Sequence, residues 1–71
     1  MNEDLASVTG LLLKACPVLR KSVSHESWLE YLHTARFVVK KLSNEECDIT
    51  ARAAGCCTIE EAIKMAETKE I

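Results

Sequence analysis

One amphipathic segment, residues 24–42, constrains the fold of this chain more than any other stretch. It holds the single tryptophan, the single tyrosine and the single phenylalanine of the sequence. Many of its apolar residues recur at alternating intervals of four and three. At about 100° per residue this spacing places them on one helix face, suited to packing against other helices. That face comprises Trp28, Tyr31, Leu32, Ala35, Val38, Val39 and Leu42. We predict a central helix over 24–42, to which the other elements dock.

Capping signals divide the rest of the chain into further helices. Ser/Thr-x-x-Glu capping boxes begin at Ser43 and at Thr58, and Ser24 can cap the first turn of the central helix. Gly55 fits the left-handed position that follows a helix end. Pro17 ends the first helix, because the residue before a proline is pushed out of helical geometry.

These signals predict an all-α fold, a small bundle of four helices at about 3–16, 24–42, 44–54 and 59–69, with a short helical turn at 17–22. In the first helix we expect Gly10 to face away from a buried stripe of Leu5, Val8, Leu12 and Ala15. We expect a third helix with an inner face of small residues, Cys47, Ala51 and Ala54, and a last helix with a buried stripe of Ile59, Ala62, Ile63 and Ala66. We expect the 71 residues to form one domain, 1–71, near the lower size limit for a self-sufficient core. This favours a homodimer, or a module that folds firmly on its partner.

The charge and hydropathy of the sequence limit where the protein can act and what it can bind. Nothing in the sequence indicates a signal peptide or a membrane span, so we expect no membrane contact and a cytoplasmic location, with the four cysteines present as thiols. The net charge of −2 combines a basic middle, residues 14–41, with an acidic end, residues 43–71. A solvated surface is the simpler interpretation, although such polarity can also orient contact with an acidic partner.

Phe37 does not fit the apolar face of the central helix. It falls on the opposite, polar side, and two interpretations are open. In the first, which we favour, another helix of the same chain covers Phe37. In the second, Phe37 anchors a binding site for a partner protein or for a second copy of the chain. Aromatic side chains are preferred anchors at protein interfaces. The candidate partner-binding residues are Phe37, His33, Glu30 and Lys41, with Leu29 and Arg36 at the edge.

The segment ITARAAGCCTIEEAIKMAE resembles a helix-turn-helix motif over about twenty residues. Ala51 and Gly55 stand four apart, as in that family, but Glu61 and Lys64 occupy two positions where the family has buried aliphatic residues. The resemblance implies a DNA-binding regulator that uses residues 44–69. The basic residues of the middle segment offer a second route to nucleic acid, namely Arg20, Lys21, Arg36, Lys40 and Lys41. An ordinary helical hairpin is the preferred interpretation.

Chemistry other than binding has little support in the sequence. The cysteines and histidines lack the spacing of a metal motif, so we predict no metal site and no cofactor. The vicinal pair Cys56-Cys57 precedes a helix start, where a thiol can be reactive, but an incidental pair in a turn is the simpler interpretation. There is no glycine-rich phosphate loop and no paired-carboxylate motif. The sequence therefore predicts no enzyme, but a small protein-interaction or regulatory module such as an inhibitor or adaptor, with DNA binding as the alternative.

Overall fold

Four α-helices make up the described part of the chain, residues 3–67 of the computed structural model. They are α1 (Glu3–Ser22), α2 (His25–Lys41), α3 (Asn44–Ala53) and α4 (Ile59–Glu67). No strand occurs among these residues, so the prediction of an all-α fold with four helices is confirmed. The predicted end of the last helix, 68–69, lies outside the described residues.

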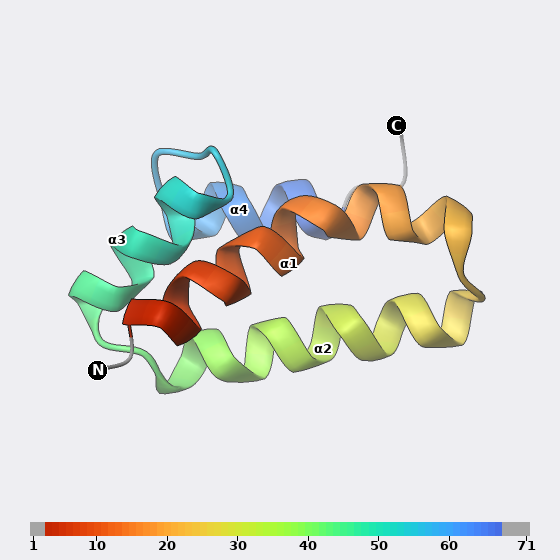
Figure 1. Cartoon of the computed structure of the whole chain (residues 1–71), viewed down its shortest axis with the longest axis horizontal. Helices are drawn as coiled ribbons and strands as arrows, with labels where there is room; N and C mark the ends of the chain where they lie inside the picture. The colour runs from red at the N-terminus through yellow and green to blue at the C-terminus, as the bar shows by residue number, and fades with distance from the viewer. Residues whose placement is uncertain (1–2, 68–71) are drawn as a thin grey trace.

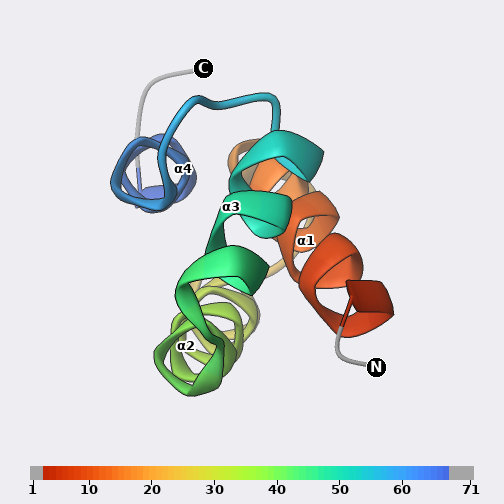
Figure 2. The same ribbon diagram turned by 90° about the vertical axis from the view of Figure 1, so that its left-hand side faces the viewer.

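The helix on which the others pack is α1. It contacts α2, α3 and α4, and its contact with α3 is the most extensive in the bundle. Figure 2 shows α1, α3 and α4 together above α2. By contrast, α2 and α4 touch each other little (Figure 1). The expectation that the other helices dock on the segment 24–42 is therefore wrong, because α2 lies at the edge of the bundle.

Pro17 lies inside α1 rather than at its end. Proline lacks the N–H that would bond to the Leu13 carbonyl, and in a helix interior it costs about 3 kcal/mol relative to alanine. Burial around it offsets this cost, since Leu13 and Cys16 are fully buried and Leu19 packs against the core. The prediction that the first helix stops at residue 16, with a separate turn after it, is therefore wrong. Tertiary packing overrides the local preference.

Small residues form the contact between α1 and α3. Gly10 is buried there, and a Cβ added to it would lie 2.6 Å from the Cβ of Ala53 and even closer to the carbonyl oxygen of Thr50. The buried Thr50 hydroxyl donates a hydrogen bond of 2.9 Å to the Ala6 carbonyl, across the two helices. The expectation that Gly10 faces away from the bundle is wrong, because only this face of α1 lets α3 approach so closely.

Because α1 turns its small residues toward α3, several of its large apolar residues face outward, although Leu13 is fully buried. Four of them are between 46% and 63% exposed, namely Leu5, Val8, Leu11 and Val18. The predicted buried stripe of Leu5, Val8, Leu12 and Ala15 is therefore wrong, since Leu12 and Ala15 are only half-buried and the other two are exposed. The buried side of α1 consists instead of Ala6, Thr9, Gly10, Leu13 and Cys16.

The helix caps form as the sequence predicts. The hydroxyls of Ser24, Ser43 and Thr58 each accept a hydrogen bond of 3.2 Å from the backbone N–H three residues later. The backbone N–H of Ser43 also donates to the Glu46 carboxylate at 2.8 Å, which completes the capping box. Gly55 has φ of 80°, the left-handed conformation that favours glycine after a helix.

The core lies where α2, α3 and α4 meet α1. From α2 it takes Trp28, Leu32, Ala35 and Val39, as predicted, whereas Tyr31 is 43% exposed. The predicted inner faces of the last two helices are confirmed for their alanines, and the buried Thr50 joins them. The other predicted members, Cys47, Ile59 and Ile63, are half-buried and pack against the core. The connected buried cluster comprises Leu13, Cys16, Trp28, Leu32, Ala35, Val39, Ala54, Ala62 and Ala66.

Candidate functional site

Phe37 lies on the outer side of α2 and is 62% exposed. No described helix covers it, so the favoured interpretation, in which the chain shields Phe37 itself, is wrong. The reason is the position of α2. A helix in the middle of a bundle is covered on both sides, but α2 packs mainly on α1 and leaves its other side to solvent. An exposed aromatic ring beside polar and basic residues is a candidate contact for a partner.

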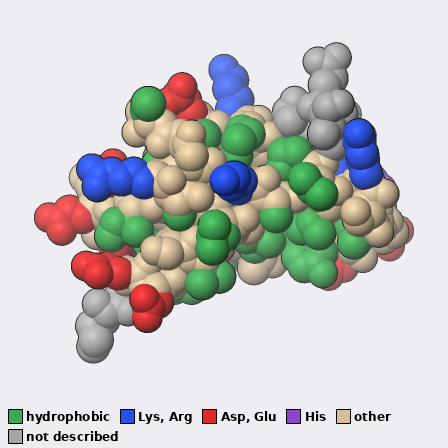
Figure 3. All heavy atoms as spheres, turned by 45° about the horizontal axis from the view of Figure 1, so that its top comes forward, with side chains coloured by type: hydrophobic (Ala, Val, Ile, Leu, Met, Phe, Trp, Pro, Cys, Tyr) green, Lys and Arg blue, Asp and Glu red, His purple; other side chains and the backbone are tan. Residues whose placement is uncertain are grey.

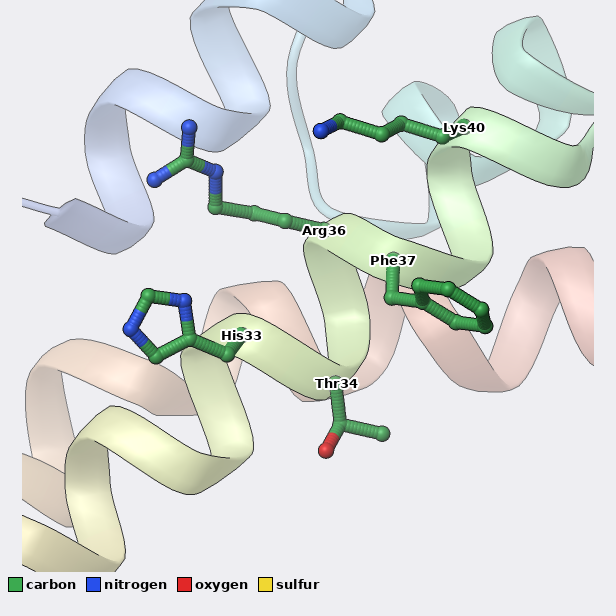
Figure 4. Close-up of a pocket in the computed structure, with 5 residues that line it drawn as sticks. All are labelled: His33, Thr34, Arg36, Phe37 and Lys40. Carbon is green, nitrogen blue, oxygen red and sulfur yellow. The ribbon is translucent and has the colours of Figure 1, made fainter.

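An open groove lies on α2 beside Phe37. Its lining residues are His33, Thr34, Arg36, Phe37 and Lys40. Figure 4 shows that Arg36 extends toward α4, while Phe37 points to the other side of the groove. Side chains three or four residues apart are neighbours on a helix surface, which explains why these five form one face.

The electrostatics of this surface are basic around an aromatic ring. The Nζ of Lys41 lies 5.3 Å from the centroid of the Phe37 ring, a cation–π distance. The Nη1 of Arg36 lies 2.9 Å from a carboxylate oxygen of Glu67 on α4. This pair is solvent-exposed and therefore contributes only about 0–1 kcal/mol to stability, but it holds Arg36 against α4. Lys40, by contrast, is exposed beside the groove.

A second depression adjoins the first on the same helix. It is lined by Ser27, Glu30, Tyr31 and Thr34, and Thr34 belongs to both depressions. Tyr31 was missed as a surface residue because it lies at the border of the apolar face, and the spacing of apolar residues does not reveal which border is covered. We use the name Phe37 face for the exposed residues Glu30, His33, Thr34, Phe37, Lys40 and Lys41.

The structure brings four of the six predicted partner-binding residues onto the Phe37 face and holds two at its edge. Glu30, His33, Phe37 and Lys41 are exposed together on α2. Leu29 is half-buried and packs against the core, so it supports the helix more than it offers a contact. Arg36 is half-buried and paired with α4.

The basic residues named for DNA binding lie at separate places. The guanidinium of Arg20 lies 4.9 Å from the ring centroid of the core tryptophan, and Arg36 pairs with α4. Lys21 is exposed near the end of α1, whereas Lys40 and Lys41 lie near the end of α2. Three of the five cations are thus engaged within the chain, since Lys41 lies over the Phe37 ring.

The hairpin of α3 and α4 is the part that resembles a helix-turn-helix motif. Residues 54–58 separate the two helices. The first turn of α4 carries the exposed acidic residues Glu60 and Glu61. Contacts to phosphate call for positive groups and hydrogen-bond donors, which these carboxylates do not provide.

The cysteines are present as free thiols in different surroundings. Burial raises the pKa of the Cys16 thiol. Burial also raises the pKa of Cys47, and the nearby carboxylates of Asp48, Glu46 and Glu60 raise it further. Cys57 is exposed in the loop before α4. Within residues 3–67 no three or more His, Cys, Asp or Glu side chains are grouped to hold a metal ion.

Comparison with known proteins adds no family to this description. The chain matches no protein-family model, no curated protein and no solved structure. Among residues 3–67, no helix combines the length and hydropathy needed to cross a bilayer. The functional argument therefore depends on the surface of the molecule itself.

Proposed function

We propose that this chain is a small non-enzymatic helical module that binds a partner protein through the Phe37 face of α2. The observation that carries the proposal is the exposure of Phe37, which is 62% accessible on a face that no described helix covers. Aromatic side chains at the centre of an interface commonly contribute most of its binding energy. The groove beside the ring gives a partner side chain a place to pack.

The charge of the Phe37 face indicates the kind of partner. Lys40 and Lys41 both lie about two turns from His33 and about one turn from Phe37, and the Nζ of Lys41 lies over the aromatic ring. A second copy of this face would bring the same positive charges, and like charges at an interface are unfavourable. The face therefore suits a different protein, with an apolar pocket for Phe37 and acidic residues around that pocket.

We propose the cytoplasm as the place of action. Four unpaired thiols support this location, because thiols persist in reducing compartments and tend to be oxidised in secreted proteins. Binding rather than catalysis is proposed because the depressions on α2 are open surfaces with no paired acid and base. An inhibitor or an adaptor is the kind of protein that such a module would make.

A photo-crosslinking experiment tests the proposal. Phe37 is replaced in living cells by p-benzoylphenylalanine, a photoreactive aromatic amino acid, and the cells are irradiated. The expected result is a covalent adduct of defined mass with one protein. The matched control carries the same amino acid at Arg52, an exposed position on α3, and should give no such adduct.

Affinity for the captured protein provides the quantitative test. Phe37→Ala should weaken binding by about 30-fold, the effect of losing an anchor of about 2 kcal/mol. Lys64→Ala, an exposed change on α4, serves as the control and should bind like the wild type. No adduct at position 37, or unchanged affinity of a folded Phe37→Ala chain, rejects the proposal.

The DNA-binding alternative stays a prediction with its own test. A titration with mixed-sequence duplex DNA at low salt measures it directly. Saturable binding that weakens steeply with salt, and that Phe37→Ala leaves intact, would place DNA ahead of a protein partner.

A further inference from the structure

The outward side of α1 carries a continuous row of apolar residues, which we name the α1 stripe. Its exposed members are Leu5, Val8, Leu11 and Val18, and its half-buried members are Leu12, Ala15 and Leu19, of which Leu12 and Leu19 also pack against the core. Single exposed apolar residues are ordinary on protein surfaces, whereas a connected row of them marks a binding surface. The hydrophobic side chains gathered along the molecule are visible in Figure 3.

The spacing within the α1 stripe is that of a helix–helix seam. Five of its members recur at alternating intervals of three and four residues, namely Leu5, Val8, Leu12, Ala15 and Leu19. This is the heptad repeat with which one helix packs along another. A helix rises about 1.5 Å per residue, so the stripe, from residue 5 to residue 19, is about 21 Å long, against 32 Å for the longest dimension of the molecule.

We propose that the α1 stripe is a homodimer interface, in which two copies pair their α1 helices in antiparallel orientation about a two-fold axis. The axis passes between residues 11 and 12 of α1. It sets Leu5 opposite the partner's Val18 and Val8 opposite the partner's Ala15, while the leucines at 11 and 12 face each other at the centre. Six of the seven members of the stripe then meet an apolar residue, as a self-complementary two-fold contact requires, while Leu19 lies opposite the partner's Asp4.

Charge selects the antiparallel orientation. The first turn of α1 carries Glu3 and Asp4, and its last turn carries Arg20 and Lys21. In the antiparallel pair the acidic start of each helix lies beside the basic end of the other, at both ends of the interface. A parallel pair would set like charges side by side at both ends. Lys21 is the exposed cation of this contact, because Arg20 lies over the core tryptophan.

This interface is separate from the proposed function. The α1 stripe and the Phe37 face share no residue. A dimer through α1 therefore uses none of the residues of the Phe37 face, which lie on α2 of each copy. Failure of the partner-binding proposal would leave the dimer proposal intact, and the reverse is also true.

Sedimentation equilibrium of the full chain tests the proposal. The chain has a mass of 7.9 kDa, and at about 100 μM we expect twice this mass, as for a modest interface of the α1 type. Val8→Glu should weaken the dimer by about 100-fold or more, because it buries an unpaired charge next to the axis. Val8 is 60% exposed in the single chain, so the helix content and melting temperature should stay at their dilute wild-type values.

Charge-reversal variants determine the orientation of the pair, and a variant of Phe37 excludes the other face. Lys21→Glu alone and Asp4→Lys alone should each weaken the dimer several-fold, whereas the double variant should restore it. Phe37→Glu is the matched control on α2 and should dimerise like the wild type. A monomeric Phe37→Glu chain, or additive weakening in the double variant, overturns the proposed interface.

A monomeric wild type at about 100 μM also overturns the proposal. Sedimentation with vesicles of phosphatidylcholine and phosphatidylglycerol then identifies what covers the stripe. Binding to the vesicles would assign the α1 stripe to a lipid surface, and its absence would assign the stripe to a helix of a different protein. Either outcome replaces the homodimer.

Discussion

The indole Nε1–H of Trp28 donates a hydrogen bond of 2.8 Å to the backbone carbonyl of Cys16, and both groups are buried. The acceptor immediately precedes Pro17, so the bond joins α2 to α1 at the point where α1 is locally weakest. Buried polar groups cost free energy when they lack a partner. Trp28 therefore stabilises the fold in two ways, by filling the core and by providing this donor.

Trp28→Phe should lower the free energy of unfolding by about 1–3 kcal/mol, since it removes a buried hydrogen-bond donor and part of the ring volume. Urea unfolding followed by circular dichroism measures the change. Tyr31→Phe is the matched control, because Tyr31 is 43% exposed, and its effect should stay within about 0.5 kcal/mol. Equal stability of the two variants would contradict the role assigned to the indole N–H.

Pro17→Ala should raise the free energy of unfolding by up to about 3 kcal/mol, because it returns an N–H to the interior of α1. Thermal and urea unfolding report the gain. Ser7→Ala, a change elsewhere in α1, provides the baseline for helix propensity and should gain about 0.5 kcal/mol or less. If Pro17→Ala gains no more than this control, the helix ends before residue 17.

Gly10→Ala should destabilise the chain, although glycine to alanine in an exposed helix gains about 1 kcal/mol. The added methyl group would meet the carbonyl oxygen of Thr50 and the Cβ of Ala53, so α1 and α3 must move apart. Overpacking of this kind typically costs about 1–3 kcal/mol. A net gain in unfolding free energy would mean that Gly10 lies on an open face.

Stability should fall at alkaline pH through the thiols of Cys16 and Cys47, whose pKa values burial raises in the folded chain. As pH rises, the thiols of the unfolded chain lose their protons first, so the unfolded state binds fewer protons than the native state. The free energy of unfolding then decreases with pH. The contribution is complete below the ordinary thiol pKa and disappears as pH passes through the raised values.

Urea midpoints measured between about pH 7 and about pH 10 test this dependence. Other groups also titrate in this range, so the comparison is with a chain carrying Cys16→Ala and Cys47→Ala. The wild type should lose more stability than this variant over the same interval. Parallel curves would show that the two thiols titrate alike in both states.

Local signals explain which parts of the fold the sequence predicts. Ser43 with Glu46, and Gly55 after α3, act through bonds and dihedral angles within a few residues, so they can be read from neighbouring positions. The end of α1 could not be read in this way. Pro17 predicts a break locally, but the burial that overcomes it comes from α2 and α4, which are distant in sequence.

The orientation of α1 shows a second limit. Its sequence has two faces with helical spacing, one with Leu5 and Val8 and the other with Ala6 and Gly10. Apolar size favours the first face as the core. In the structure the second face is buried, because Thr50 of α3 approaches it closely. That approach depends on the complementary shapes of the two helices, which the spacing of apolar residues does not predict.

The candidate site also has one part that the sequence predicts and one part that it does not. Spacing alone places Phe37 opposite the apolar face of α2, and the structure has it on the solvent side of that helix. Whether another helix covers Phe37 depends on the position of α2 in the bundle. That position follows from the preference of α3 and α4 for α1, which no single segment of the sequence expresses.

The alanine-lined core has a consequence for the temperature dependence of stability. The heat capacity of unfolding grows with the apolar surface that becomes hydrated, and an ordinary domain gains about 12–15 cal/mol/K per residue. In this chain the buried positions are filled mainly by alanine, while Leu5, Val8, Leu11 and Val18 of α1 are already in contact with water. Unfolding the single chain therefore adds less apolar hydration than usual. Its free energy of unfolding should therefore change little with temperature, with nearly the same value at refrigerator temperature as at physiological temperature.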